Sequence, residues 1–210
     1  MYTRCNLSSK WKSWLRRVHS RYKLGSWAGT RSPGLPTGAD EEHTYGQRFT
    51  REWTTGPERL KAGVDRQTIW LLLDLAARMP PPFYVLYVLH VSRTGADRAR
   101  YESPLLNYPQ LAEFLWTFRD FFQCDARHDL WVGSANCPDL LVVDHHALLY
   151  AYGPLERYSA VLHENGFQEG IVEIPDPHVH HYHDEFDGDE EQVLRSFAWA
   201  KSQFRPNDEE

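Results

Sequence analysis

The chain has 210 residues, 41% of them hydrophobic and 14% aromatic, which is enough for one domain with a sizeable core and excludes a fully disordered protein. Its three cysteines form no CxxC pair, which argues against a disulfide scaffold and a cysteine-rich zinc module and favours a reducing compartment. No apolar run reaches the roughly 18 residues that span a bilayer, and the N-terminus lacks the apolar stretch of a secretory signal. We therefore expect a cytoplasmic protein, with an organelle transit peptide as the open alternative.

Charge is distributed unevenly along the chain. Residues 1–39 hold eight Lys or Arg and no Asp or Glu, so the net charge of −6 divides into +8 for this segment and 15 − 29 = −14 for the rest. An acidic body repels a phosphate backbone. We therefore expect no nucleic-acid binding by the main domain.

The basic segment contains one amphipathic pattern. Residues 8–23 place Trp11 and Trp14 on an apolar helical face and Arg16 and Arg17 on the opposite, basic face. Such a helix could contact a membrane surface weakly, serve as a transit peptide, or dock a partner. The simpler alternative is a poorly ordered tail.

Glycine and proline then interrupt any periodicity over residues 25–57, which indicates a linker. The predicted organisation is a basic, Gly/Pro-rich and flexible arm and linker over residues 1–57, followed by a single globular domain over residues 58–210.

Hydrophobic periodicity predicts alternating helices and strands from residue 58 onward. The elements expected in chain order are helix 65–78, strand 83–91, its hairpin partner 98–102, a helix from 109, strand 130–132, a hairpin of 139–144 with 147–152, a helix from 154, strand 167–174, and a last helix from about 190 to 205. The strand pairs are joined by short turns, which favours antiparallel pairing. The prediction is an α+β fold with an antiparallel or mixed sheet of about six strands and helices packed mainly on one face.

Four of the eleven histidines lie between residues 178 and 183. On an extended segment His178 and His180 point to one side, while His181 and His183 point to the other. Two imidazoles on one side can bind zinc, manganese or iron, with Asp184 or Glu185 as a third ligand. This pattern predicts a metal-binding protein or metal-dependent hydrolase, and the alternative is a solvated, polar strand end.

The spacing of His178, His180 and His183 resembles the HxHxxH metal motif of metallo-β-lactamase-type hydrolases. That family carries an Asp just before its third histidine, where this chain has Tyr182. Only 27 residues follow His183, far fewer than that fold requires. The resemblance therefore does not extend beyond the spacing.

A second resemblance involves Asp144, His145 and His146, which follow an apolar run as in the motif of the DHH phosphoesterases. The upstream Asp-x-Asp and the long C-terminal domain of that family are missing here. A polar hairpin tip between residues 139–144 and 147–152 is the interpretation that the local sequence favours.

An acidic segment with interspersed aromatic residues follows the histidines. Its members are Tyr182, Phe186, Asp187, Asp189, Glu190 and Glu191. A surface of this kind suits electrostatically steered docking on a basic protein partner. The leading hypothesis from sequence is thus a non-catalytic binding protein of the immunity or adaptor type, and the metal-dependent hydrolase is the alternative.

Overall fold

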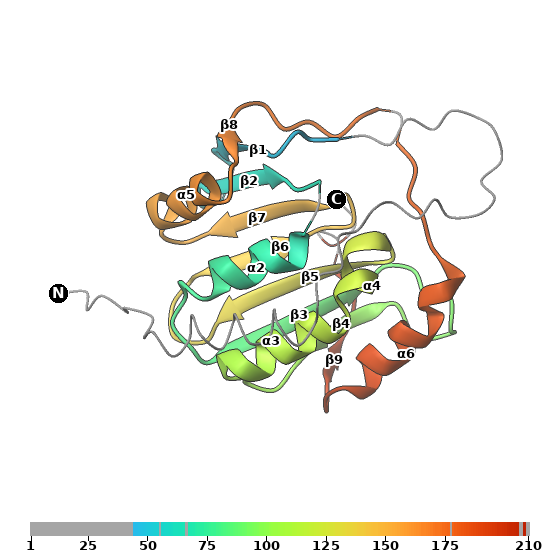
Figure 1. The fold of residues 1–210 in the computed structure, drawn as a ribbon. Helices are drawn as coiled ribbons and strands as arrows, with labels where there is room; N and C mark the ends of the chain where they lie inside the picture. The colour runs from blue at the N-terminus through green and yellow to red at the C-terminus, as the bar shows by residue number, and fades with distance from the viewer. Residues whose placement is uncertain (1–43, 55, 66, 177, 206–207, 209–210) are drawn as a thin grey trace, which may run out of the picture. The chain divides into compact units, whose positions relative to one another are not determined.

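A nine-stranded sheet organises the part of the chain that the computed structural model describes, which is residues 44–54, 56–65, 67–176, 178–205 and 208 (Figure 1). The strand order is β8-β1-β2-β7-β6-β5-β3-β4-β9. Neighbouring strands are antiparallel throughout, except for the short parallel pair of β1 and β8. These residues belong to one compact unit, 43–210.

The elements have the following bounds. The strands are β1 Arg48–Glu52, β2 Arg59–Gly63, β3 Phe83–Leu89, β4 Ala99–Glu102, β5 His128–Ser134, β6 Leu140–Val143, β7 Leu148–Tyr152, β8 Gln168–Glu169 and β9 Ala200–Ser202. The helices are α2 Thr68–Ala76, α3 Tyr108–Thr117, α4 Arg119–Cys124, α5 Leu155–Glu164 and α6 Asp187–Arg195, and a 3-10 turn, η1, spans Asp184–Phe186.

The long central strand β3 shows how sequence alternation divides the two faces of the sheet. Tyr87 faces the helices, where its ring centroid lies 6.3 Å from that of Phe122 in α4. Tyr84 faces the other way and covers Gly133 of β5, where any Cβ would lie 2.2 Å from the tyrosine ring. Glycine is therefore required at position 133 for β3 and β5 to pair at this point.

The helices form a layer over one face of the sheet, with α2, α3 and α4 lying across its centre (Figure 1). Their apolar stripes supply the core, since Ile69, Leu72, Leu111 and Leu115 are all fully buried. The capping box of Asn107 and Gln110 fixes the start of α3, with Pro109 in its first turn. The predicted α+β class, with helices mainly on one face, is confirmed.

The sheet has three strands more than predicted, namely β1, β2 and β9. Strand β1 lies inside residues 25–57, which the sequence assigned to a linker, so the folded unit begins before residue 58. Phe49 is 2% exposed and pairs with Ala62 of β2. Gly46 and Gly56 flank β1, so they bound a strand that pairs with β2 and do not mark a linker.

The predicted last helix ends ten residues early, at Arg195. Ala200, expected on its buried stripe, instead pairs with Glu102 as β9 adds to the open edge of β4. The turn between them is fixed by Trp199, whose indole N–H donates to the Val193 carbonyl at 3.1 Å. Tertiary edge pairing and aromatic packing outweigh the helical periodicity here.

The strand expected over residues 167–174 pairs only at Gln168 and Glu169. The described residues from there to η1, 170–176 and 178–183, form no helix or strand and include the clustered histidines. Within the described residues, no helix has the length and apolar character needed to cross a bilayer. The basic arm with Trp11, Trp14, Arg16 and Arg17 lies outside the described residues.

His128 provides a test of how this core responds to pH. Its ring is 3% exposed and lies 4.6 Å, between centroids, from Phe121. Its Nδ1 has no hydrogen-bond partner among the described residues. Burial lowers the pKa of His128 from 6.5 to about 4. Between these values the unfolded chain binds a proton that the folded protein does not, so stability falls as the pH falls from 6.5 toward 4.

We expect His128→Phe to remove about 2 kcal/mol from the difference in unfolding free energy between pH 7 and pH 5. Urea unfolding at both pH values measures this difference. The matched control is His163→Gln, since the His163 side chain is 52% exposed. A His128→Phe variant with the full wild-type pH dependence would contradict the assignment.

Candidate functional site

Four histidines from two distant segments meet beside the end of the sheet. His145 and His146 occupy the turn between β6 and β7, and His178 and His180 come from the irregular segment after β8. The ring centroid of His146 lies 4.2 Å from that of His145 and 4.9 Å from those of both His178 and His180. The rings of His178 and His180 are 5.0 Å apart. We call these four residues the histidine cluster.

The turn that carries His145 and His146 is shaped by Asp144. Its carboxylate accepts the backbone N–H of His146 at 3.0 Å and that of Leu148 at 2.8 Å. Ala147 takes a left-handed backbone conformation with φ of 61°. An aspartate that bonds its own following backbone is a common turn former, and here it holds two adjacent histidines at the sheet end.

The opposite segment is fastened to the residues just before β5. The backbone N–H of Ala126 donates to the His181 carbonyl at 3.1 Å. The N–H of His183 donates to Asp125 at 2.8 Å, and Arg127 donates to the His183 carbonyl at 2.7 Å. These bonds begin one residue after His180, so they determine where His180 lies.

Arg127 is the anchor of this arrangement, with a side chain that is completely buried. It forms a two-pronged pair with Asp125, with Nε to Oδ1 at 2.7 Å and Nη2 to Oδ2 at 2.9 Å. Its Nη1 reaches Glu190 at 2.5 Å and Asp187 at 3.0 Å, both in α6. Burial acts to lower the pKa of Arg127, but its hydrogen bonds to Asp125 and Glu190 outweigh burial and raise it. Arg127 therefore stays charged and joins α6 and β5 to residues 178–183, which we call the histidine segment.

Hydrogen bonds assign roles to the ring nitrogens of the cluster. Nδ1 of His145 lies 2.8 Å from the Asp129 carboxylate, and Nδ1 of His178 lies 3.2 Å from the carbonyl oxygen of Pro175. Nδ1 of His146 lies 3.5 Å from the Asp144 carboxylate. The contacts of His145 and His178 favour the tautomer with the proton on Nδ1, which leaves Nε2 with a lone pair, and the longer His146 contact is compatible with the same tautomer. Outward-facing Nδ1–H groups of this kind orient histidines that bind metals.

The electrostatic environment keeps His180 neutral. Burial first, and then the neighbouring His145, His146 and His178, lower its pKa to about 4. One ring nitrogen each of His145, His146 and His180 lie within 4.8 Å of one another. Neutral imidazoles at such separations can share a cation, because metals bind the unprotonated ring.

A second group of possible metal ligands, His90, Asp129 and His145, shares His145 with the first group. His90 follows β3, Asp129 lies near the start of β5, and both are on the face away from the helices, where Asp129 is opposite Val88. Nε2 of His90 lies 3.0 Å from Oδ1 of Asp129, close enough for an ion pair but without the geometry of a hydrogen bond. Burial acts to raise the pKa of Asp129, but the hydrogen bond from His145 and the adjacent His90 ring lower it to about 2.

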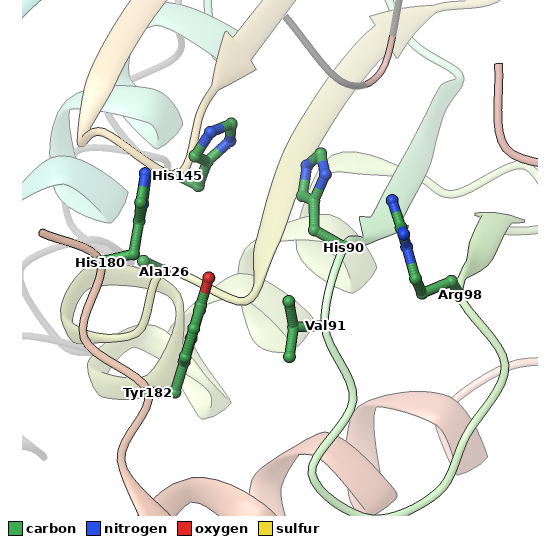
Figure 2. Close-up of a pocket in the computed structure, with 7 residues that line it drawn as sticks. All are labelled: His90, Val91, Arg98, Ala126, His145, His180 and Tyr182. Atoms are coloured by element: carbon green, nitrogen blue, oxygen red, sulfur yellow. The ribbon is translucent and has the colours of Figure 1, made fainter. Parts of the chain in front are cut away.

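A hollow of about 250 Å³ opens beside both sets (Figure 2). Its lining residues are His90, Val91, Arg98, Ala126, His145, His180 and Tyr182. Figure 2 shows the rings of His90, His145 and His180 around this hollow, with the Tyr182 hydroxyl pointing between them. The guanidinium of Arg98 lies 4.7 Å from the centre of the Phe204 ring. The hollow gives small molecules access to two members of the cluster.

The structure thus brings together the predicted pair His178 and His180. It adds His145 and His146, which lie on the hairpin tip that the sequence predicted but were given no chemical role. His181 and His183 stack on each other, with ring centroids 6.1 Å apart.

The two carboxylates predicted as metal ligands, Asp184 and Glu185, lie exposed in η1 and belong to neither ligand set found among the described residues. The carboxylate that lies among the histidines is Asp129. Sequence reasoning missed Asp129 and His90 because the pairing of β3 with β5, which brings them together, leaves no local signal.

The predicted acidic surface is altered by folding. Glu190 is fully buried, so it cannot be part of a docking surface, and Asp187 pairs with Arg93 and Arg127. The Phe186 ring packs 5.8 Å from that of Phe121. The other five predicted members retain some solvent exposure. Docking through this surface stays a prediction.

Comparison of the chain with protein-family models, curated proteins and solved structures gave no match. The interpretation of the site therefore depends on its own geometry and chemistry.

The role of Arg127 can be tested by removing its charge. Arg127→Met leaves the buried carboxylates of Asp125 and Glu190 without their partner, and we expect a loss of about 3–5 kcal/mol in unfolding free energy. The control is Arg195→Met, which breaks an exposed i,i+4 pair with Glu191 and is expected to change stability by about 0.5 kcal/mol or less. Urea unfolding measures the stability of both variants. Equal losses would contradict the claim that Arg127 stabilises the fold more than an exposed ion pair does.

Proposed function

We propose that this protein binds a divalent transition-metal ion of the zinc class on the four imidazoles of the histidine cluster. The observation that carries the proposal is the contact between Nε2 of His146 and Nε2 of His178, which are 3.3 Å apart. When each ring carries its proton on Nδ1, beside the oxygens of Asp144 and Pro175, two lone pairs point at each other across this contact. Only a cation between the rings, or a proton on one of them, makes it favourable.

The distance between these two nitrogens matches that between two ligands of one metal ion. Two ligand nitrogens that each lie about 2.0–2.1 Å from a tetrahedral ion are about 3.3 Å apart. A proton on Nε2 of either ring would satisfy this one pair alone. A metal ion between the two rings would also lie near the imidazoles of His145 and His180, whose ring centroids are within 5.0 Å of that of His146 or His178.

Three of the four histidines have an oxygen partner for the ring nitrogen that does not face the proposed ion. Asp129 orients His145, the Pro175 carbonyl orients His178, and Asp144 faces His146. Partners of this kind fix the ring tautomer and make the ligand nitrogen more basic. The two carboxylates also offset part of the charge of a bound dication.

The reaction class that the position supports is metal-assisted hydrolysis. A bound ion of this class lowers the pKa of a coordinated water toward neutrality and so provides a hydroxide nucleophile. His145 and His180 line the hollow, so a substrate there would lie beside the ligands. The neutral ring of His180 and the Tyr182 hydroxyl are polar groups of this chain that would contact it.

Metal analysis of the full chain purified without a histidine tag tests the proposal. We expect the double variant His146→Ala/His178→Ala to bind one zinc ion fewer per chain than the unmodified protein, because it removes two of the four ligands. Isothermal titration of chelator-treated protein with zinc chloride gives the count.

The matched control is His181→Ala, which changes a histidine in the same segment whose ring lies outside the cluster. It is expected to bind as much zinc as the unmodified chain. Equal zinc binding by the double variant and by this control would refute the four-histidine site. Hydrolysis of p-nitrophenyl acetate that chelation abolishes and zinc restores would support the reaction class.

A further inference from the structure

We infer that His90, Asp129 and His145 form a second metal site, so that the protein holds a pair of ions with the His145 ring shared between them. The inference goes beyond the proposed function and rests on it only for the ion on the other side of His145. It is carried by three ligand atoms on the hollow side of the cluster, which come from the ends of β3 and β5 and from the β6–β7 turn.

An unsatisfied nitrogen is the first observation. Nε2 of His90 is buried and has no hydrogen-bond partner among the described residues, although it lies 3.0 Å from Asp129. The ring is held in place by its neighbours, with centroids 4.7 Å from His145 and 5.2 Å from Phe204. Buried polar atoms are nearly always bonded, and an exception calls for an explanation such as an ion.

The distances around Asp129 are the second observation. Its Oδ1 lies 3.0 Å from Nε2 of His90 and 2.8 Å from Nδ1 of His145. Ligand atoms at right angles around an octahedral ion lie about 2.9 Å apart when each is about 2.0–2.1 Å from it. One ligand atom from each of the three residues lies within 4.8 Å of the others. Both distances from Asp129 therefore match neighbouring ligand positions around an octahedral ion.

The ligand types indicate which ion would bind. Two imidazoles and one carboxylate would leave further ligand positions of the ion open, as in sites that take ferrous iron, manganese or zinc and then bind water or substrate. His90 and His145 both line the hollow of about 250 Å³, so those positions have access to it. A small ligand with oxygen donors is the chemical class that this second ion would take.

The sharing of His145 follows from its two ring nitrogens. Nδ1 faces Asp129, which leaves Nε2 for the histidine cluster. When both ions are bound, the Nδ1 proton, now in the bond to Asp129, must leave to solvent, and the ring becomes an imidazolate bridge. Binding of the second ion therefore releases one proton more than binding of neutral histidines would.

Zinc counting on the full-length chain tests the inference. Chelator-treated protein is titrated with zinc chloride, and the unmodified chain is expected to bind two ions. His90→Gln and Asp129→Asn should each bind one, because each removes a ligand of the second site. The amide oxygen that Asp129→Asn introduces can still accept the Nδ1–H of His145, so this variant should keep the first ion. His181→Ala is the control and should bind two.

The double variant His146→Ala/His178→Ala separates this inference from the proposed function. One ion in the unmodified chain that persists in His90→Gln but is lost in the double variant would overturn the second site and leave the four-histidine site. One ion that is lost in His90→Gln but persists in the double variant would overturn the four-histidine site and support an ion on His90 and Asp129. Absence of binding in the unmodified chain would overturn both.

A direct measurement guards against variants that fail to fold. Anomalous diffraction at the zinc edge from crystals of the unmodified protein grown with zinc should show two peaks on opposite sides of the His145 ring. A single peak, or a second peak away from His90 and Asp129, would overturn the inference whatever the variants do.

Discussion

The buried ion cluster around Arg127 is the interaction on which the rest of this structure depends. A guanidinium without solvent contact costs several kcal/mol in lost hydration unless its donors are paired. Here Asp125 takes two of those donors, and Glu190 and Asp187 of α6 take another. Because these partners come from separate segments, the cluster forms only when α6 and the start of β5 are already adjacent.

The same cluster explains why an irregular segment can hold a defined position. The described residues between β8 and η1 have no strand partner, and the histidine segment depends on bonds to Ala126, Asp125 and Arg127. Glu190 is held in turn by the hydroxyls of Ser92 and Thr94. Loss of one charge would therefore loosen both α6 and the segment that presents His180, so core electrostatics and site geometry are coupled.

The sheet supplies the other half of the site through alternation and register. His128 and Asp129 are adjacent, yet one faces the aromatic core and the other faces His90 and His145. Successive side chains of a strand point to opposite faces, so a register shift of one residue would exchange their environments. The seven-residue pairing of β3 with β5 prevents such a shift. Gly133 allows this pairing, because it leaves room for the Tyr84 ring.

Much of this protein could be predicted from sequence because the signals are local. Runs such as Phe83–Leu89 predict strands from their composition, and the repeat of Leu111 and Leu115 predicts a helix. The α+β class, the β6–β7 hairpin and the pairing of His178 with His180 on one side of an extended segment all follow from such patterns. Where tertiary contacts compete with periodicity, as at Ala200 in β9, local prediction was wrong.

The composition of the site was decided by tertiary structure alone. His90, Asp129, His145 and His180 are separated by up to ninety residues, and only strand pairing and the Arg127 cluster bring them together. A carboxylate near His180 in sequence, Asp184, is exposed, whereas Asp129 from a distant strand is buried among the histidines. Sequence determines which residues can bind a metal or carry a charge. Their approach in space depends on long-range contacts whose loop-closure cost and burial no local pattern records.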